Sequence, residues 1–125
     1  MWPALLEQEG VRILVAEEPG AQGLLGYSAY GTSRDPDAGG ATGEVRTFFV
    51  ASASWRRGVG TAMMNRALRD LREMGFADAT VWSFADNARA NSFYEHNGFE
   101  RDGGERREDA WAGILEVRYR RPLPT

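Results

Sequence analysis

The chain has 125 residues, enough for one hydrophobic core but not for two, so we expect a single domain over residues 1–125. Its net charge of −3 argues against nucleic-acid binding through a general basic field. All 15 basic residues are arginine and no residue is cysteine, which excludes lysine chemistry, disulfides, thiolate metal ligands and a cysteine nucleophile.

Targeting signals are missing from the sequence as given. No apolar run approaches the roughly 18 residues that would indicate a membrane span. The first residues lack the basic start and apolar stretch of a signal peptide. We therefore expect no membrane attachment and a cytoplasmic location.

The first half of the chain predicts a short helix, three strands and a loop. Pro3 suits a first helical turn and Gly10 a stop, so residues 3–9 predict a helix. Residues 11–16 are rich in β-branched side chains and, with the turn formers of residues 17–23, predict a hairpin whose second arm is residues 24–30. Four glycines and one proline in residues 31–43 predict a loop, and residues 44–50 predict a third strand.

A longer helix follows, from about residue 59 to residue 74. Its apolar residues fall at i, i+3, i+4 and i+7, which gives the helix one apolar face; they are Met64, Ala67, Leu68 and Leu71. Gly75 has the place of a helix-ending glycine. Residues 79–84 predict the next strand.

A second helix is predicted up to about His96, with Asp86 or Asn87 as its N-cap and residues 97–98 as its stop. On this helix we expect Phe93 to face the core and Tyr94 to lie at the edge of the packed face. His96, the one histidine, is expected at the surface or as a cap rather than in catalysis.

The end of the chain predicts less regular structure. Residues 99–101 predict a short strand, and the charged residues 102–110 predict a loop. Residues 114–119 alternate between apolar and polar side chains, which predicts a closing strand.

The segment Trp-Arg-Arg-Gly-Val-Gly-Thr at residues 55–61 stands between a strand and a helix, where an anion binds well. The first turn of a helix offers N–H groups and the positive end of the helix dipole. Gly58 and Gly60 let a diphosphate approach the backbone, and Arg56 and Arg57 can add charged contacts. The pattern alone is weak, since such glycines are often simple turns. It matches neither the P-loop nor the Rossmann fingerprint.

Two segments at this spacing resemble the GNAT superfamily of N-acetyltransferases. Residues 55–60 follow the pattern Gln/Arg-x-x-Gly-x-Gly/Ala, with Trp55 in place of Gln or Arg. Residues 87–99 match Asn-x-x-Ala-x-x-Phe-Tyr-x-x-x-Gly-Phe in full, and residues 115–122 look like the last strand of many bacterial members. The resemblance extends over nearly all of residues 11–122.

The resemblance implies an α+β fold with a mixed, mostly antiparallel central sheet flanked by helices. The family places a strand and two helices before the segment that resembles residues 11–16, so this chain is expected to lack them, with residues 1–9 as the tail of the second helix. Residues 11–16 would then form an open apolar edge that invites pairing with another chain. A homodimer is therefore a hypothesis from the sequence.

The resemblance also implies transfer of acetyl from acetyl-CoA to a primary amine of a small molecule or peptide, by direct attack and without a metal. Two alternatives stay open. The chain could be a CoA-binding domain with little turnover, because part of the family's acceptor wall is absent. It could also be a small interaction domain in which the glycines are only turns.

Roles follow from the resemblance. Glu44 is the candidate base, acting through water, and its alternative is a solvated carboxylate at a strand end. The backbone near Val50 is expected to hold the thioester carbonyl, and Tyr94 to protonate the leaving thiolate. Asn87 would position the pantetheine arm or Tyr94. The cofactor-binding residues expected are Phe49, Val50, Arg56, Arg57, Gly58, Val59, Gly60, Thr61, Asn87 and Tyr94.

Overall fold

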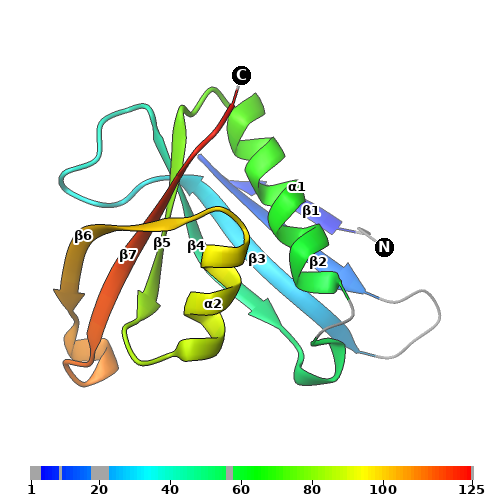
Figure 1. The fold of residues 1–125 in the computed structure, drawn as a ribbon. Coiled ribbons are helices and arrows are strands. Elements are labelled where there is room, and N and C mark those ends of the chain that lie inside the picture. The colour runs from blue at the N-terminus through cyan, green and yellow to red at the C-terminus, as the bar shows by residue number, and fades with distance from the viewer. Residues whose placement is uncertain (1–3, 9, 18–22, 56–57, 125) are drawn as a thin grey trace.

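The computed structural model describes residues 4–8, 10–17, 23–55 and 58–124. Strands from the whole length of the chain form one sheet in the order β1-β2-β3-β4-β5-β7-β6, and α1 and α2 lie on the same face of it (Figure 1). Neighbouring strands are antiparallel except β4 and β5, which are parallel. The α+β fold with a mixed, mostly antiparallel sheet is therefore confirmed.

The start of the chain is a strand, so the helix predicted over residues 3–9 is wrong. β1 (Ala4–Gln8) pairs with β2 (Val11–Glu17), with Gln8 opposite Val11. Gly10 ends no helix; it has φ +66° at the point where the chain reverses into β2. So short a segment gains little as a helix but can satisfy its backbone groups along β2.

The sequence argument for a homodimer is also wrong. β2 is hydrogen-bonded to β1 on one side and to β3 (Leu24–Thr32) on the other. The segment that was expected to form an open edge is therefore an inner strand of the sheet. No pairing of residues 11–16 with a second chain follows.

The sheet opens between its two parallel strands. β4 (Thr42–Val50) follows the loop of residues 33–41 and pairs with β5 (Asp78–Phe84). This pairing stops at Val45 and Val81, beyond which the two strands diverge (Figure 1). The divergence exposes backbone and side chains in the middle of the sheet, where the sites described below lie.

α1 (Val59–Glu73) confirms the predicted longer helix. Its buried apolar side chains are Met63, Met64, Ala67, Leu68 and Leu71. They form the part of the core that lies between the helix and strands β3 and β4. Gly75, with φ +98°, ends the helix as predicted.

α2 (Ala88–His96) packs over the place where β4 and β5 separate (Figure 1). Asn91 fixes it there: its Nδ2 donates to the carbonyl of Ala85, and its Oδ1 accepts a 2.6 Å hydrogen bond from Ser83. Short 3₁₀ turns at Ser52–Ser54 and Asp109–Trp111 precede α1 and the last strand.

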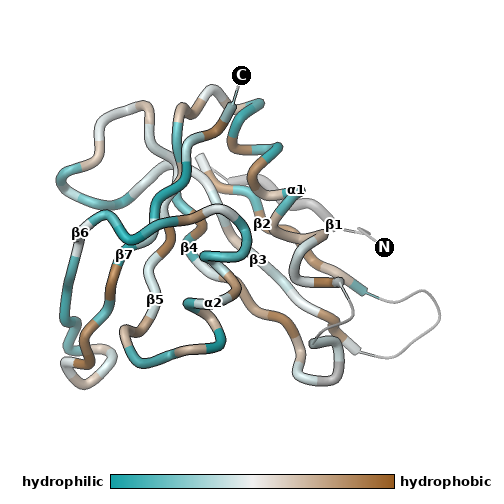
Figure 2. Tube along the Cα trace, viewed as in Figure 1, coloured by the Kyte–Doolittle hydropathy of each residue, from teal (hydrophilic) through white to brown (hydrophobic). Residues whose placement is uncertain are grey.

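The last two strands correct the expected loop over residues 102–110. β6 (Glu100–Arg107) pairs with β7 (Leu115–Pro122), and the register shifts between Arg101 and Glu105, where Gly103 has φ +91°. β6 is at the edge of the sheet, where charged side chains are solvated and discourage pairing with another chain. Its hydrophilic character in Figure 2 is thus that of an edge strand. Within the described residues, no helix is long and apolar enough to cross a membrane.

Candidate active site

Two cavities meet where β4 and β5 diverge. The larger, of about 1010 Å³, is bounded by loop 33–41, β4, β5, β6 and β7. The smaller, of about 730 Å³, lies between the end of β4, the start of α1 and α2. Both are lined by Phe48, Asn87, Ala90 and Tyr94. Two molecules bound in the two cavities could therefore touch beside Tyr94.

The start of α1 at the smaller cavity is suited to an anion. Gly58 is the N-cap residue, with φ +81°, and no side chain caps the helix. The N–H groups of the first turn, Val59, Gly60 and Thr61, precede the first helical hydrogen bond, which runs from the N–H of Ala62 to the carbonyl of Gly58. Such uncapped groups favour a phosphate. Arg56 and Arg57, also expected to bind the cofactor, lie outside the described residues.

The two glycines of this turn serve different purposes. A Cβ on Gly58 would meet nothing within 4 Å, so its backbone is open to a ligand, and its φ of +81° favours glycine. A Cβ on Gly60 would lie 3.2 Å from the ring of Phe93. Gly60 therefore also allows α1 to pack closely against α2.

The end of β4 turns backbone groups toward the gap in the sheet. The N–H of Ala51 donates to Leu25 on β3, so strand alternation directs the N–H and carbonyl of Val50 to the opposite side. The indole N–H of Trp55 donates to that carbonyl at 2.9 Å. Phe49 also lines the smaller cavity, and its ring is 5.5 Å from that of Tyr27.

Trp55 connects β4 to α2. Besides its bond to Val50, its ring is covered by the guanidinium of Arg89, 3.8 Å from the ring centroid. Both residues line the smaller cavity. The residue that departs from the family pattern is therefore part of the site, and Arg89 is a lining residue that the sequence did not indicate.

Tyr94 and Phe93 take the opposite places to those predicted. Tyr94 is buried, with ring centroids 5.7 to 6.0 Å from those of Phe93, Phe99 and Tyr119. Phe93 is half-buried and packs on Phe48 at 5.4 Å. α2 places Tyr94, one turn after Asn91, against the opened sheet, and this leaves Phe93 to cover the smaller cavity.

The hydroxyl of Tyr94 is unusual for a buried phenol. It makes no hydrogen bond with any residue that the structure describes, and it is not sealed from the cavities. Burial raises the pKa of Tyr94 to about 12. The phenol therefore keeps its proton at neutral pH, with a donor available for a ligand.

Asn87 caps α2 as predicted. Its Oδ1 accepts a 3.1 Å hydrogen bond from the N–H of Ala90, while its Nδ2 makes none within the described part of the chain. Because Asn87 lines both cavities, this amide can donate to a ligand at their junction. His96 is exposed, as expected, at the last turn of the helix.

Glu44 is buried beneath Arg34. Only 1% of Glu44 is exposed, and it lines neither cavity. Its two oxygens accept hydrogen bonds from the backbone and guanidinium of Arg34, one of them at 3.0 Å, and this bond raises the pKa of the arginine. The alternative of a solvated carboxylate is therefore wrong, and Arg34 stands between Glu44 and the larger cavity.

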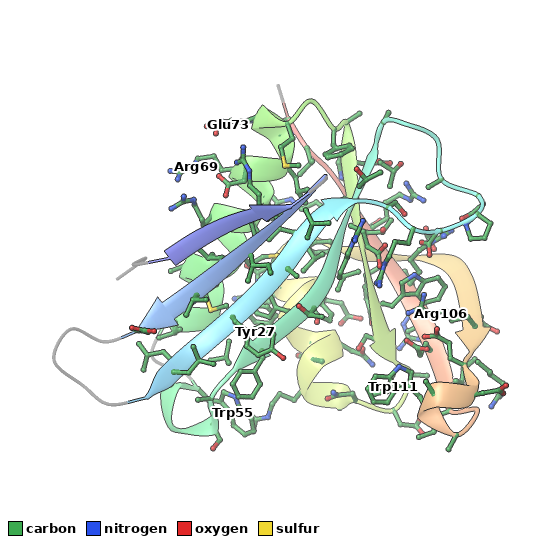
Figure 3. All side chains as sticks on the ribbon, turned by 180° about the vertical axis from the view of Figure 1, so that it is seen from behind. Tyr27, Trp55, Arg69, Glu73, Arg106 and Trp111 are labelled. Carbon is green, nitrogen blue, oxygen red and sulfur yellow. The ribbon has the colours of Figure 1, made fainter. Side chains whose placement is uncertain are left out.

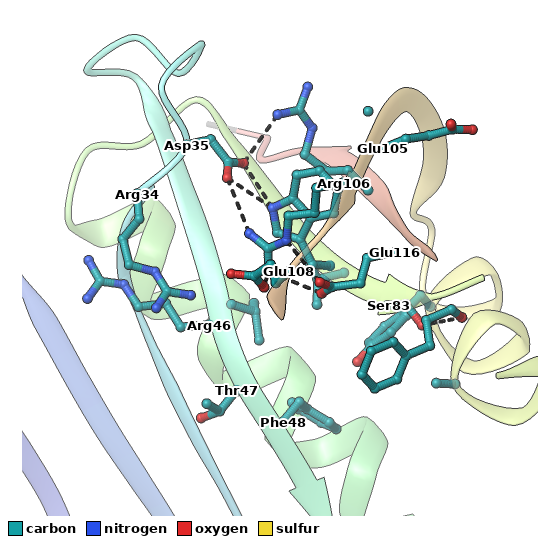
Figure 4. A pocket seen from close by; sticks show the side chains of 18 of the residues that line it. Arg34, Asp35, Arg46, Thr47, Phe48, Ser83, Glu105, Arg106, Glu108 and Glu116 are labelled. Atoms are coloured by element: carbon teal, nitrogen blue, oxygen red, sulfur yellow. Dashed lines mark hydrogen bonds and ion pairs between the residues drawn. The ribbon is translucent and has the colours of Figure 1, made fainter. Parts of the chain in front are cut away.

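The larger cavity has a network of charges that the sequence did not indicate. Asp35 accepts from the indole of Trp82 at 3.0 Å and from Arg118 at 3.2 Å, and Arg106 lies over the Trp82 ring (Figure 4). Glu116 is buried and ion-paired with Arg106. The network joins segments far apart in sequence, and only the fold brings them together.

Comparisons with known proteins agree with this geometry. The profile of the acetyltransferase (GNAT) family matches residues 1–99, so the chain belongs to this family. It is 42% identical over 64 residues to a mycothiol acetyltransferase of Beutenbergia cavernae, which covers 51% of this chain and 21% of that protein. A mycothiol acetyltransferase of Parafrankia sp. is 38% identical over 83 residues, 66% of this chain and 22% of that protein.

A solved structure shares the fold. The structure of yncA from Salmonella typhimurium with its cofactor acetyl-CoA has a TM-score of 0.74 and 21% identity, over 93% of this chain and 66% of that one. At this identity the likeness shows the fold alone. The chain spans about a fifth of the length of the two curated relatives named above.

Proposed function

We propose that the chain transfers acetyl from acetyl-CoA to a primary amine of a small molecule or peptide by direct attack. The main support for this proposal is the junction of the two cavities at Tyr94, because a cofactor bound in one cavity and an acceptor bound in the other would meet there. Family membership and relatives that are acetyltransferases support it.

The smaller cavity fits the cofactor. The diphosphate would lie on the N–H groups of Val59, Gly60 and Thr61, with Gly58 open to it and Arg56 and Arg57 adding charge. The Nδ2 of Asn87 would donate to the pantetheine arm. The cofactor supplies an activated acetyl group, whose carbonyl oxygen would accept from the N–H of Val50 at the end of β4.

Tyr94 is the proposed acid. The departing thiolate needs a proton, and the Tyr94 hydroxyl carries one that no described residue holds. Its burial at the junction places this proton away from bulk water. The same burial keeps the phenol neutral throughout the usual assay range.

The proposed base has two candidates. Glu44 remains the one that the family resemblance implies, but a proton would have to pass Arg34 through water to reach it. Glu116 lines the larger cavity and is buried against Arg106, so it is closer to an acceptor bound there. Glu44→Gln and Glu116→Gln separate the two: the variant of the true base should lose most of kcat, and the other variant should keep it.

Calorimetry with acetyl-CoA, with dephosphorylated pantetheine as control, tests the proposal first. Tight binding that needs the diphosphate would support the site at residues 56–61, and release of CoA thiol with a panel of amines would then support transfer. Binding without transfer to any amine would favour a CoA-binding domain with little turnover. A folded protein that does not bind acetyl-CoA would refute both.

A further inference from the structure

Four arginines line the larger cavity, and one differs from the others: they are Arg34, Arg46, Arg106 and Arg118. Arg34 is paired with Glu44, Arg106 with Glu116, and Arg118 with aspartates. Arg46 makes no ion pair with a carboxylate among the residues that the structure describes. This partly buried guanidinium faces the cavity without such a pair, which indicates a place for an anionic ligand.

The geometry of Arg46 leaves donors for a ligand. Its Nε and Nη2 donate to one acceptor, the carbonyl of Thr32, at 3.3 and 2.7 Å. Because a guanidinium has five N–H donors, the outer ones stay available in a fixed plane. The bond to Thr32 thus orients the side chain without neutralising it.

The surroundings add positive charge. Figure 4 shows Arg34 and Arg46 on the same side of the cavity, with Arg106 and Glu116 away from them. Burial, and then the charge of Arg34, lower the pKa of Arg46. Glu44 is the one carboxylate whose charge acts on Arg46, and Glu44 is already ion-paired with Arg34, so a negative charge on a ligand would complement Arg46.

We infer that the acceptor of the proposed reaction is a small amine that also carries an anionic group, and that Arg46 binds this group. The inference rests on the proposed function for the identity of the amine, but the anion site stands on its own geometry. Arg46 lines the larger cavity together with Phe48, which also lines the smaller cavity at their junction. One small molecule can therefore present its amine at Tyr94 and its anion to Arg46.

A carboxylate is the simplest such group, because it accepts two parallel hydrogen bonds from a guanidinium. The acceptor class is then that of small amino acids, as opposed to plain amines or amides. A bound carboxylate also leaves the carboxylates Glu108 and Glu116 elsewhere in the cavity to attract the ammonium group.

The experiment compares matched acceptors. Glycine, β-alanine and γ-aminobutyrate are each compared with the corresponding amide as acceptors. 2-Aminoethyl phosphate tests whether the anion can be a phosphate. Binding to the CoA-loaded protein is measured by calorimetry, and transfer by release of CoA thiol. The variants are Arg46→Gln, Arg46→Lys and, as a control, Arg69→Gln, which changes an exposed arginine on α1 far from the cavity (Figure 3).

We expect the wild type to prefer the best amino acid over its amide by about tenfold or more, the effect of one charge-assisted pair. Arg46→Gln should bring this ratio close to one, and Arg69→Gln should leave it unchanged. Arg46→Lys keeps the charge and should retain part of the preference, which covers the case in which Arg46→Gln fails to fold. A preference for 2-aminoethyl phosphate would support the site, with phosphate as the anion.

Equal use of acids and amides by the wild type would overturn the inference and leave the proposed function standing. A preference that survives in Arg46→Gln would also overturn it. Selective binding of acids with no transfer to any of them would support the anion site and count against the proposed function. The two failures are therefore distinguishable.

Discussion

Tyr94→Phe tests the proposed acid with the smallest change in structure. The variant keeps the ring and its contacts with Phe99 and Tyr119, and it removes a hydroxyl that makes no hydrogen bond within the described residues. The free energy of unfolding should therefore change by less than about 1 kcal/mol. Loss of a positioned proton donor should lower kcat by about 100-fold or more, a barrier increase of about 3 kcal/mol.

The assay is steady-state release of CoA thiol, with the dissociation constant of acetyl-CoA from calorimetry and the unfolding free energy from urea titration. Tyr27→Phe is the matched control, because Tyr27 is 39% exposed and lines neither cavity (Figure 3). A Tyr94→Phe variant with unchanged kcat would refute the acid role and leave Tyr94 as a core residue. A loss of acetyl-CoA affinity equal to the loss of kcat/KM would show a binding role instead.

Two further predictions concern the same junction. Trp55→Phe keeps a ring for Arg89 but loses the 2.9 Å hydrogen bond to the Val50 carbonyl. We therefore expect kcat to fall about tenfold, with little change in the acetyl-CoA affinity measured by calorimetry. An unchanged kcat would count against Trp55 as a positioning residue. Folding raises the pKa of Tyr94 from 10.0 to about 12, so its contribution to stability is complete below pH 10 and is lost as pH rises toward 12, by about 3 kcal/mol. Urea titrations from pH 10 to pH 12 should show that the free energy of unfolding falls less steeply with pH for Tyr94→Phe than for the wild type. Equal slopes for the two proteins would contradict the assigned burial of Tyr94.

The elements that the sequence predicted are those that local chemistry specifies. α1 follows from an apolar period of one helical turn and from Gly75 as its stop. Strands β2 to β4 follow from apolar runs and the turns between them. The two family motifs lie at the ends of such elements, so their placement could be predicted as well.

The errors occur where a distant partner decides the structure. β1 was predicted as a helix because its backbone partner, β2, cannot be recognised from residues 4–8 alone. The part of β6 after residue 101 was predicted as a loop because its charges suit solvent, yet an edge strand has one solvated side. The places of Phe93 and Tyr94 depend on the divergence of β4 and β5, which no helical pattern contains.

The larger cavity is the part of the molecule that depends most on contacts between segments distant in sequence. Arg118 on β7 holds Asp35 and Asp37 of loop 33–41 and Asp102 of β6, so one side chain assembles three segments into the wall of the cavity. The residues of these ion pairs recur at no regular spacing in the sequence. Hydrogen bonding to Arg118 lowers the pKa of Asp37 below its usual value, and this contact exists only in the folded chain. The proposed cofactor side of the site is thus encoded in short motifs, whereas the proposed acceptor side is encoded in contacts between distant segments. Among the arginines of this cavity, these contacts leave Arg46 without an ion pair to any residue that the structure describes, and its charge is therefore the basis of the proposed preference for an anionic acceptor.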